Sequence, residues 1–250
     1  MKIINLESGS KGNSTIITYK NTTILIDLGI SNRKLNEYLN NFNVDKIDAV
    51  LITHTHVDHV KGLKTYIKNN NTPIYISSLM LKELDYEINN KIIVDGDNLI
   101  INDLEINIMR LSHDVNEIFG YVIKGNKEIV YITDTGYINN KYFSLIDNKD
   151  VYLLESNHDV EMVWESSYPQ HIKARVIGDR GHLSNNDASY YLSNLIGNNT
   201  SHIVLCHLSE HNNTEDLALN TLKEQLIRKN KIVNNICCAK QNESVVITFD

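Results

Sequence analysis

Short apolar runs rich in β-branched residues alternate with polar, Gly- and Asn-containing turns over the first half of the chain. This pattern predicts strands, and the longer segments between some of them predict helices. The expected strands cover residues 3–6, 15–19, 23–28, 48–53, 74–76, 92–94, 98–101, 105–110, 120–124 and 128–133. The expected helices cover residues 32–41, 61–68 and 78–86.

The second half mixes the two kinds of element more evenly. Strands are expected at residues 152–154, 202–206 and 244–248, and helices at 171–178, 187–195 and 214–228. No linker separates two halves, and no repeat occurs at a fixed period. Many strands with helices inserted between them predict an α/β (α+β) chain, with two helix-covered sheets in a single domain over residues 1–250.

The composition is that of a globular protein, since 42% of the 250 residues are hydrophobic and 22% are charged. The 24 basic and 31 acidic residues give 24 − 31 = −7, so no global positive field attracts a nucleic acid. Bound divalent metals can reverse the sign of a site locally. The net charge therefore argues against a simple nucleic-acid binder but does not exclude a nucleic-acid enzyme.

The cysteines and the N-terminal segment bear on the cellular compartment. The chain has three cysteines, and the adjacent pair Cys237 and Cys238 would form a poor disulfide, which favours reduced thiols. The first residues lack the apolar core of a secretory signal, and no segment approaches the roughly 20 apolar residues of a membrane helix. We expect a cytoplasmic protein with no membrane partner, and the sequence leaves its oligomeric state open.

The most informative segment is residues 52–59, Ile-Thr-His-Thr-His-Val-Asp-His, which directly follows an apolar strand. In an extended segment His54 and His56 point to the same side, and a turn into the next helix can aim Asp58 and His59 at a neighbouring point. Imidazole and carboxylate are ligands for ions such as Zn²⁺. The alternative is that these are exposed loop histidines, but three of the chain's 10 histidines fall within the six positions 54–59. The pattern predicts a metal centre.

This segment resembles the HxHxDH signature of the metallo-β-lactamase fold, a four-layer αββα sandwich with a binuclear metal site at the edge of its sheets. Further motifs follow in the family's order around His113, Asp134 and His207. The resemblance implies two divalent metal ions, Zn²⁺ or Mn²⁺. It implies a first metal held by His54, His56 and His113, and a second held by Asp58, His59 and His207, with Asp134 and a hydroxide bridging the two.

Each outlying position also has a plainer interpretation. His113 fits an ordinary loop histidine, and Asp134 fits a turn, because Asp-Thr-Gly is also turn chemistry. His202 and His211 compete with His207, but neither lies directly at the end of the predicted strand. The order of the motifs favours the ligand interpretation at each of the three positions.

Two later segments resemble tRNase Z-like enzymes. In those enzymes a glutamate after a strand orients a histidine from a Gly-His-Ser-type loop, and the histidine protonates the leaving oxygen of a phosphodiester. Glu155 and His182 fit these roles, and the expelled alkoxide needs such an acid. The alternative is a turn-capping glutamate and a surface histidine. Together with Asp58, this pair makes up the catalytic candidates.

Several stretches are similar to the YycJ-type (WalJ or VicX) family, namely residues 7–15 (Glu-Ser-Gly-Ser-Lys-Gly-Asn-Ser-Thr), 155–159, 168–169, 181–185 and 207–213. This resemblance implies a metal-dependent phosphodiesterase that acts as a 5′-to-3′ double-stranded DNA exonuclease, in which the bridging hydroxide attacks phosphorus. The alternatives are a small-molecule phosphodiesterase or thioesterase of the same fold, and a non-enzymatic signalling partner.

DNA is thus the expected partner, and a small basic patch near the proposed acid could hold its backbone. Between residues 168 and 182 the sequence has three basic residues, Lys173, Arg175 and Arg180, and only one acid. The alternative is that these basic side chains lie on a solvated helix face. Ser184 and Asn185, which follow the His182 motif, complete the substrate-binding candidates.

Overall fold

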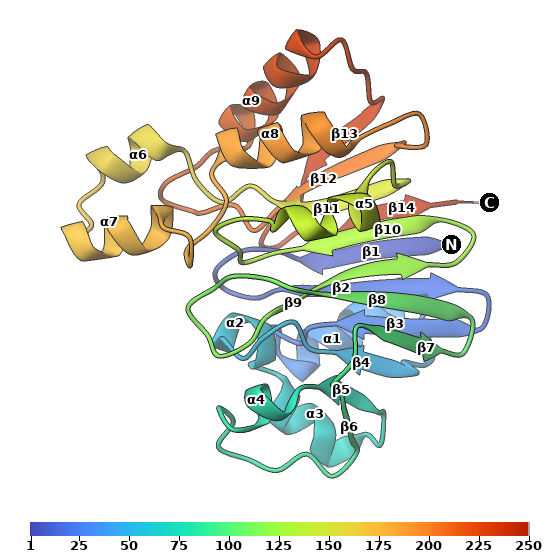
Figure 1. Cartoon of the computed structure of the whole chain (residues 1–250). Coiled ribbons are helices and arrows are strands. Elements are labelled where there is room, and N and C mark those ends of the chain that lie inside the picture. Colours follow the sequence, from blue (N-terminus) through green and yellow to red (C-terminus); the bar gives the residue numbers. More distant parts are fainter. Residues whose placement is uncertain (250) are drawn as a thin grey trace.

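Two seven-stranded sheets form the centre of the molecule (Figure 1). The structure is a computed structural model and describes residues 1–249. The first sheet has the order β14 (Val245–Thr248), β1 (Lys2–Glu7), β2 (Ser14–Tyr19), β3 (Thr22–Ile26), β4 (Ala49–Leu51), β5 (Ile74–Ile76) and β6 (Lys91–Ile93). The second has the order β13 (Asn235–Cys238), β12 (His202–Cys206), β11 (Val151–Glu155), β10 (Glu128–Ile132), β9 (Phe119–Lys124), β8 (Leu104–Arg110) and β7 (Asn98–Ile101).

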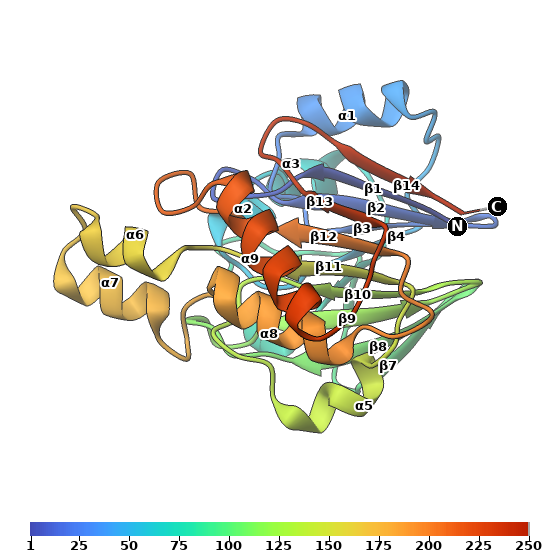
Figure 2. The same ribbon diagram turned by 90° about the horizontal axis from the view of Figure 1, so that it is seen from above.

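Helices cover the outer face of each sheet, which gives four layers (Figure 2). The first sheet carries α1 (Asn32–Asn41), α2 (Val57–Val60), α3 (Leu63–Asn69) and α4 (Ser78–Leu81). The second carries the 3₁₀ helix η1 (Asn140–Tyr142), α5 (Phe143–Ile146), α8 (Asn185–Leu195) and α9 (Glu215–Arg228). An arm made of α6 (Val160–Glu165) and α7 (Gln170–Ile177) projects from the body in both views. The predicted αββα architecture is confirmed.

Two buried clusters hold the layers together. Residues of both sheets share the first cluster, in which Ile16 and Ile24 of the first sheet belong with Tyr121 of the second. The second cluster joins the second sheet to its helices through residues such as Leu192 and Leu222. Each fully buried Leu or Ile contributes roughly 1.5–3 kcal/mol. The strand ends that carry polar residues are therefore fixed by apolar packing behind them.

Strand direction brings the functional segments to one edge. β3 runs parallel to β4, and β10, β11 and β12 run parallel to one another, so each set ends at a common edge of its sheet. The Tyr121 hydroxyl donates a hydrogen bond of 2.7 Å to Ile52 O and ties the second sheet to the histidine segment. No helix within residues 1–249 is long and apolar enough to cross a membrane.

Most predicted elements are present with shifted ends, and the differences have local causes. The helix expected at 61–68 is present as α3, and the separate short helix α2 lies before it, with Lys61 and Gly62 between the two. A Cβ at Gly62 would lie 2.2 Å from Ile30 O, so the chain packs too closely there for another residue. The helices η1, α5 and α6 are too short to show a periodicity, and β13 depends on its pairing with β12.

Candidate metal centre

The seven predicted ligand positions converge at the edge where the strands end. β4 leads into the histidine segment, in which His56 precedes α2 while Asp58 and His59 lie in its first turn. The other positions follow β8, β10 and β12. The structure brings His54, His56, Asp58, His59, His113, Asp134 and His207 together in overlapping groups whose ligand atoms lie within 4.8 Å of one another.

The first group consists of His54, His56 and His113. Nε2 of His113 lies 3.3 Å from Nδ1 of His56, and Nε2 of His54 is buried without a hydrogen-bond partner. Burial, together with the nearby His59, holds the pKa of His54 well below its usual value. His54 is therefore neutral and has a lone pair available for a cation.

The second group consists of Asp58, His59 and His207. Nε2 of His207 is buried, forms no hydrogen bond and lies 3.5 Å from Oδ2 of Asp58. Oδ2 of Asp134 lies 3.1 Å from Nε2 of His59, and Asp134 also forms a group with His54 and His59. Asp134 thus lies between the two groups.

The donor set fits divalent metal ions. It combines imidazole nitrogens and carboxylate oxygens, and two of its buried ring nitrogens have no protein partner. Burial opposes a charge on His59, but Asp134 and Asp27 outweigh it and raise the pKa of His59 to about 10. Without a cation the carboxylates thus draw a proton into the site, and a metal would replace that proton.

Hydrogen bonds behind the rings fix their orientation. His113 Nδ1 donates to Gly181 O at 3.0 Å, which leaves Nε2 free for a metal. His59 Nδ1 lies 2.7 Å from Oδ2 of Asp27, a carboxylate that also accepts 2.7 Å bonds from Thr53 N and Oγ1. Our sequence reasoning missed Asp27. The available signal was an acid directly after a buried apolar strand.

Three residues of the site adopt a left-handed backbone. The φ angles of Asp27, Asp134 and His207 are 59°, 55° and 55°, and each residue follows a strand within two positions. Such a conformation is uncommon for residues other than glycine and costs of order 1–3 kcal/mol. The surrounding sheet packing thus holds these three side chains in directions that an extended strand would not give them.

Glu155 and His182 form a pair beside these groups. Oε1 of Glu155 lies 2.8 Å from Nδ1 of His182, and Oε2 accepts from Thr135 N and Leu183 N at 2.9 and 3.1 Å. Burial opposes ionisation of Glu155, but His182 and His207 lower its pKa to about 2. Burial likewise opposes protonation of His182, yet the Glu155 charge outweighs it and raises the pKa of His182. Glu155 is thus ionised, and its charge favours the protonated form of His182.

Comparison with known proteins assigns the family. Residues 22–208 match the model of the beta-lactamase superfamily domain. The chain is 34% identical over 232 residues to exodeoxyribonuclease WalJ of Streptococcus pneumoniae, covering 88% of this chain and 86% of WalJ. It is 33% identical over 233 residues to exodeoxyribonuclease YycJ of Bacillus anthracis, covering 90% of this chain and 88% of YycJ. The chain belongs to the WalJ/YycJ branch of the metallo-β-lactamase superfamily. The expected resemblance is confirmed.

A solved structure supports the fold of this WalJ/YycJ-type chain. The metallo-β-lactamase fold protein YhfI from Bacillus subtilis aligns with a TM-score of 0.72 at 16% identity, covering 98% of both chains. The two sheets with their outer helices are thus the arrangement of the superfamily.

The predicted basic patch of this WalJ/YycJ-type chain consists of one buried lysine and two exposed arginines. Lys173 is buried, and its Nζ donates to Trp164 O at 2.5 Å. Arg175 pairs with Asp114, and Arg180 donates to the carbonyls of His113 and Val115. The Lys173 contact joins α7 to α6, and the two arginine contacts attach this part of the chain to the loop that carries His113.

The two polar substrate-binding candidates are buried. Ser184 is the N-cap of α8, and its Oγ accepts a 3.1 Å bond from Asp187 N. The side chain of Asn185 bonds to Ser156 Oγ and Asn213 Nδ2. Both side chains form hydrogen bonds within the loops around Glu155 and His182. Their contact with a substrate stays a prediction.

Proposed function

We propose that this chain is a metal-dependent exodeoxyribonuclease that degrades double-stranded DNA from its 5′ ends. The observation that carries the proposal is the Glu155–His182 pair, which lies beside two groups of metal-ligand side chains. Similarity to WalJ and YycJ over 88–90% of the chain supports DNA as the substrate. Hydrolysis of a phosphodiester needs both charge stabilisation and a proton for the leaving oxygen, and these two features would supply them.

In this proposal two divalent ions, Zn²⁺ or Mn²⁺, occupy the two groups. His54, His56 and His113 would hold the first ion, and Asp58, His59 and His207 the second, with Asp134 shared between them. When bound, the ions would activate a water molecule and stabilise charge on the phosphate oxygens. Of the two carboxylates in these groups, Asp58 is the more exposed, with 22% of its side chain accessible against 2% for Asp134. Asp58 would therefore lie nearer the substrate.

His182 would act as the general acid. Because Nδ1 faces Glu155, Nε2 is the nitrogen left to meet a leaving oxygen. The His182 side chain is 20% exposed while Glu155 is fully buried, which suits a proton donor that reaches the substrate and a carboxylate that holds it. The raised pKa of His182 favours the protonated form that this role requires.

We also propose that residues 1–250 act as one domain and work in the cytoplasm. The buried cluster shared by both sheets supports a single domain. The three free cysteines, Cys206, Cys237 and Cys238, support a reducing compartment.

Digestion of end-labelled linear double-stranded DNA tests the proposal, alongside elemental analysis of bound metal. With Mn²⁺ or Zn²⁺, a 5′ label should appear at once as labelled mononucleotide, whereas a 3′ label should give a series of shortening fragments. Asp58→Ala should abolish both patterns. The reverse distribution of labels would contradict the polarity. Bound metal without DNA cleavage would contradict the nuclease and favour a small phosphodiester, which the net charge of −7 also suits.

A further inference from the structure

The glycine-rich loop of residues 8–13 connects two ligand segments that lie far apart in the sequence. At its start, Ser8 Oγ accepts a 2.8 Å hydrogen bond from His207 N. At its end, Asn13 N donates to Asp58 O at 2.8 Å. The loop therefore touches the backbones that carry Asp58 and His207, both of which belong to the second ligand group.

The Asn13 side chain is directed at the same group. Its Oδ1 accepts from Gly9 N at 2.9 Å, and its Nδ2 donates to Gly9 O at 3.0 Å, so the amide has a fixed orientation. The same Nδ2 lies 3.2 Å from Oδ2 of Asp58 and 2.9 Å from Nε2 of His59. Asn13 is only 2% exposed. A buried donor thus faces two candidate ligand atoms.

We propose that Asn13 is a positioning residue for the second metal site and that the Ser8–Asn13 loop braces that site. The amide hydrogen of Asn13 would hold the Asp58 carboxylate in its ligating orientation, while Ser8 holds the His207 backbone. Hydrogen-bond partners that orient a metal ligand usually affect metal affinity by about 10–100-fold. The inference rests on the proposed two-metal function, and it predicts that the loop affects the second metal site alone.

The loop is itself held from outside. Gln241 Oε1 accepts from Lys11 N at 2.8 Å, and Gln241 Nε2 donates to Gly12 O at 3.0 Å. Gly9 has a φ of 141°, and a Cβ there would lie 2.7 Å from Gln241 Oε1.

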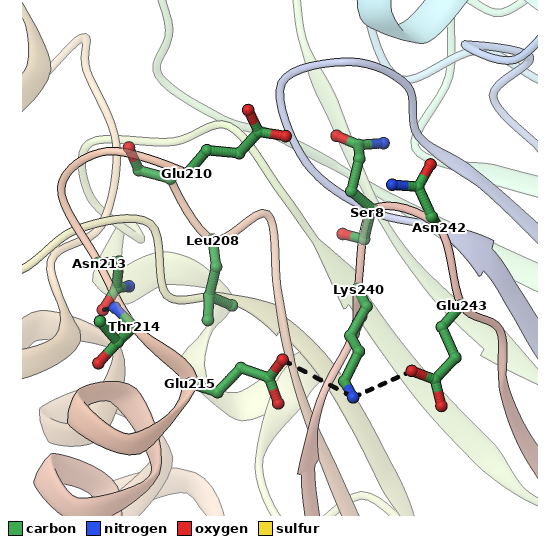
Figure 3. Close-up of a pocket in the computed structure, with 12 residues that line it drawn as sticks. Ser8, Leu208, Glu210, Asn213, Thr214, Glu215, Lys240, Asn242 and Glu243 are labelled. Carbon is green, nitrogen blue, oxygen red and sulfur yellow. Dashed lines mark hydrogen bonds and ion pairs between the residues drawn. The ribbon is translucent and has the colours of Figure 1, made fainter.

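On this outer side Ser8 lines a cavity of about 390 Å³, where Lys240 lies between Glu215 and Glu243 (Figure 3). None of the proposed metal ligands lines this cavity. The loop is thus fixed between the cavity and the metal centre.

The packing on the inner side is equally close. Gly29 N donates to Asn13 O at 2.9 Å, and a Cβ at Gly29 would lie 1.6 Å from Asp58 O. Because these contacts are made by backbone atoms, they persist when the Asn13 side chain is removed. The substitution Asn13→Ala therefore deletes the amide contacts and keeps the backbone links to Asp58.

Calorimetric titration of the metal-free full chain with Zn²⁺ tests the inference. The wild type should bind in two steps, and Asn13→Ala and Ser8→Ala should weaken the same single step, about 10–100-fold for Asn13→Ala. His207→Ala should abolish that step, and His113→Ala should abolish the other. Lys11→Ala is the matched loop control, because Lys11 is exposed and pairs with Glu210, and it should leave both steps unchanged.

Three results would overturn the inference, and they differ from one another. Unchanged binding by Asn13→Ala would show that its amide does not position Asp58, while the two-metal function stands. Equal weakening of both steps, with a lower melting temperature of the metal-free variant, would show a general structural role. Binding of only one Zn²⁺ per wild-type chain would contradict the two-metal function itself and remove the second site with it.

Discussion

Nδ1 of His182 lies 2.8 Å from Oε1 of Glu155, and the same oxygen lies 2.9 Å from Nδ1 of His207. One buried carboxylate therefore contacts both the proposed acid and a proposed metal ligand. The arrangement couples the orientation of His182 to the position of the metal centre, because a movement of Glu155 would affect both rings.

Replacement of His182 by alanine should slow DNA hydrolysis by roughly 10²–10⁴-fold and leave the metal content unchanged. The physical reason is that His182 would supply a proton without holding a metal. Rates on labelled DNA and elemental analysis of the same preparation measure the two effects. His211→Ala is the control, since His211 is exposed. A full rate in His182→Ala would exclude the acid role.

Replacement of Glu155 by glutamine should move the alkaline limb of the kcat–pH profile to lower pH. The Glu155 charge raises the pKa of His182 against the opposing effect of burial, so its removal lowers that pKa. Activity requires protonated His182 and is lost as the pH rises through its pKa, so the loss should begin at lower pH in the variant. Profiles of both proteins with the same metal provide the measurement. A coincident alkaline limb would contradict the assignment.

Replacement of Asp27 by asparagine should weaken metal binding by about 10–100-fold. The Asp27 carboxylate lies 2.7 Å from Nδ1 of His59 and accepts two bonds from Thr53, and asparagine keeps its size but removes its charge. Competition with a chelating dye measures the affinity. Asp85→Asn is a suitable control, because Asp85 is exposed at the surface. Equal affinities of wild type and Asp27→Asn would indicate that Thr53 alone fixes the segment.

The histidine segment was predictable because its information is local. His54, His56, Asp58 and His59 lie within six positions after a strand, and the helix that aims the last two begins within the same segment. Every strand of the two sheets except β13 was equally accessible, since apolar runs bounded by turns mark them. The αββα layers then followed from the family resemblance.

The residues behind the ligands were not predictable in the same way. Asp27 lies 32 positions from His59, and Asn13 lies 46 positions from it, so no local spacing connects them. Only the parallel pairing of β3 with β4 brings Asp27 beside the histidine segment. The basic residues of α7 illustrate the opposite problem. Their composition predicts a substrate surface, but a sequence does not show that Lys173 is buried against Trp164 while Arg175 stays exposed.

Lys173 allows a direct test of this last point. Its ammonium group is buried between the two helices of the arm and donates to Trp164 O, so Lys173→Met should leave that carbonyl without its donor. We expect a loss of roughly 1–3 kcal/mol in stability, with no change in the KM for DNA or its salt dependence. Thermal unfolding and kinetics at several salt concentrations measure these quantities. Lys223→Met, on the exposed side of α9, is the control. A raised KM with a shallower salt dependence would instead establish Lys173 as a phosphate contact.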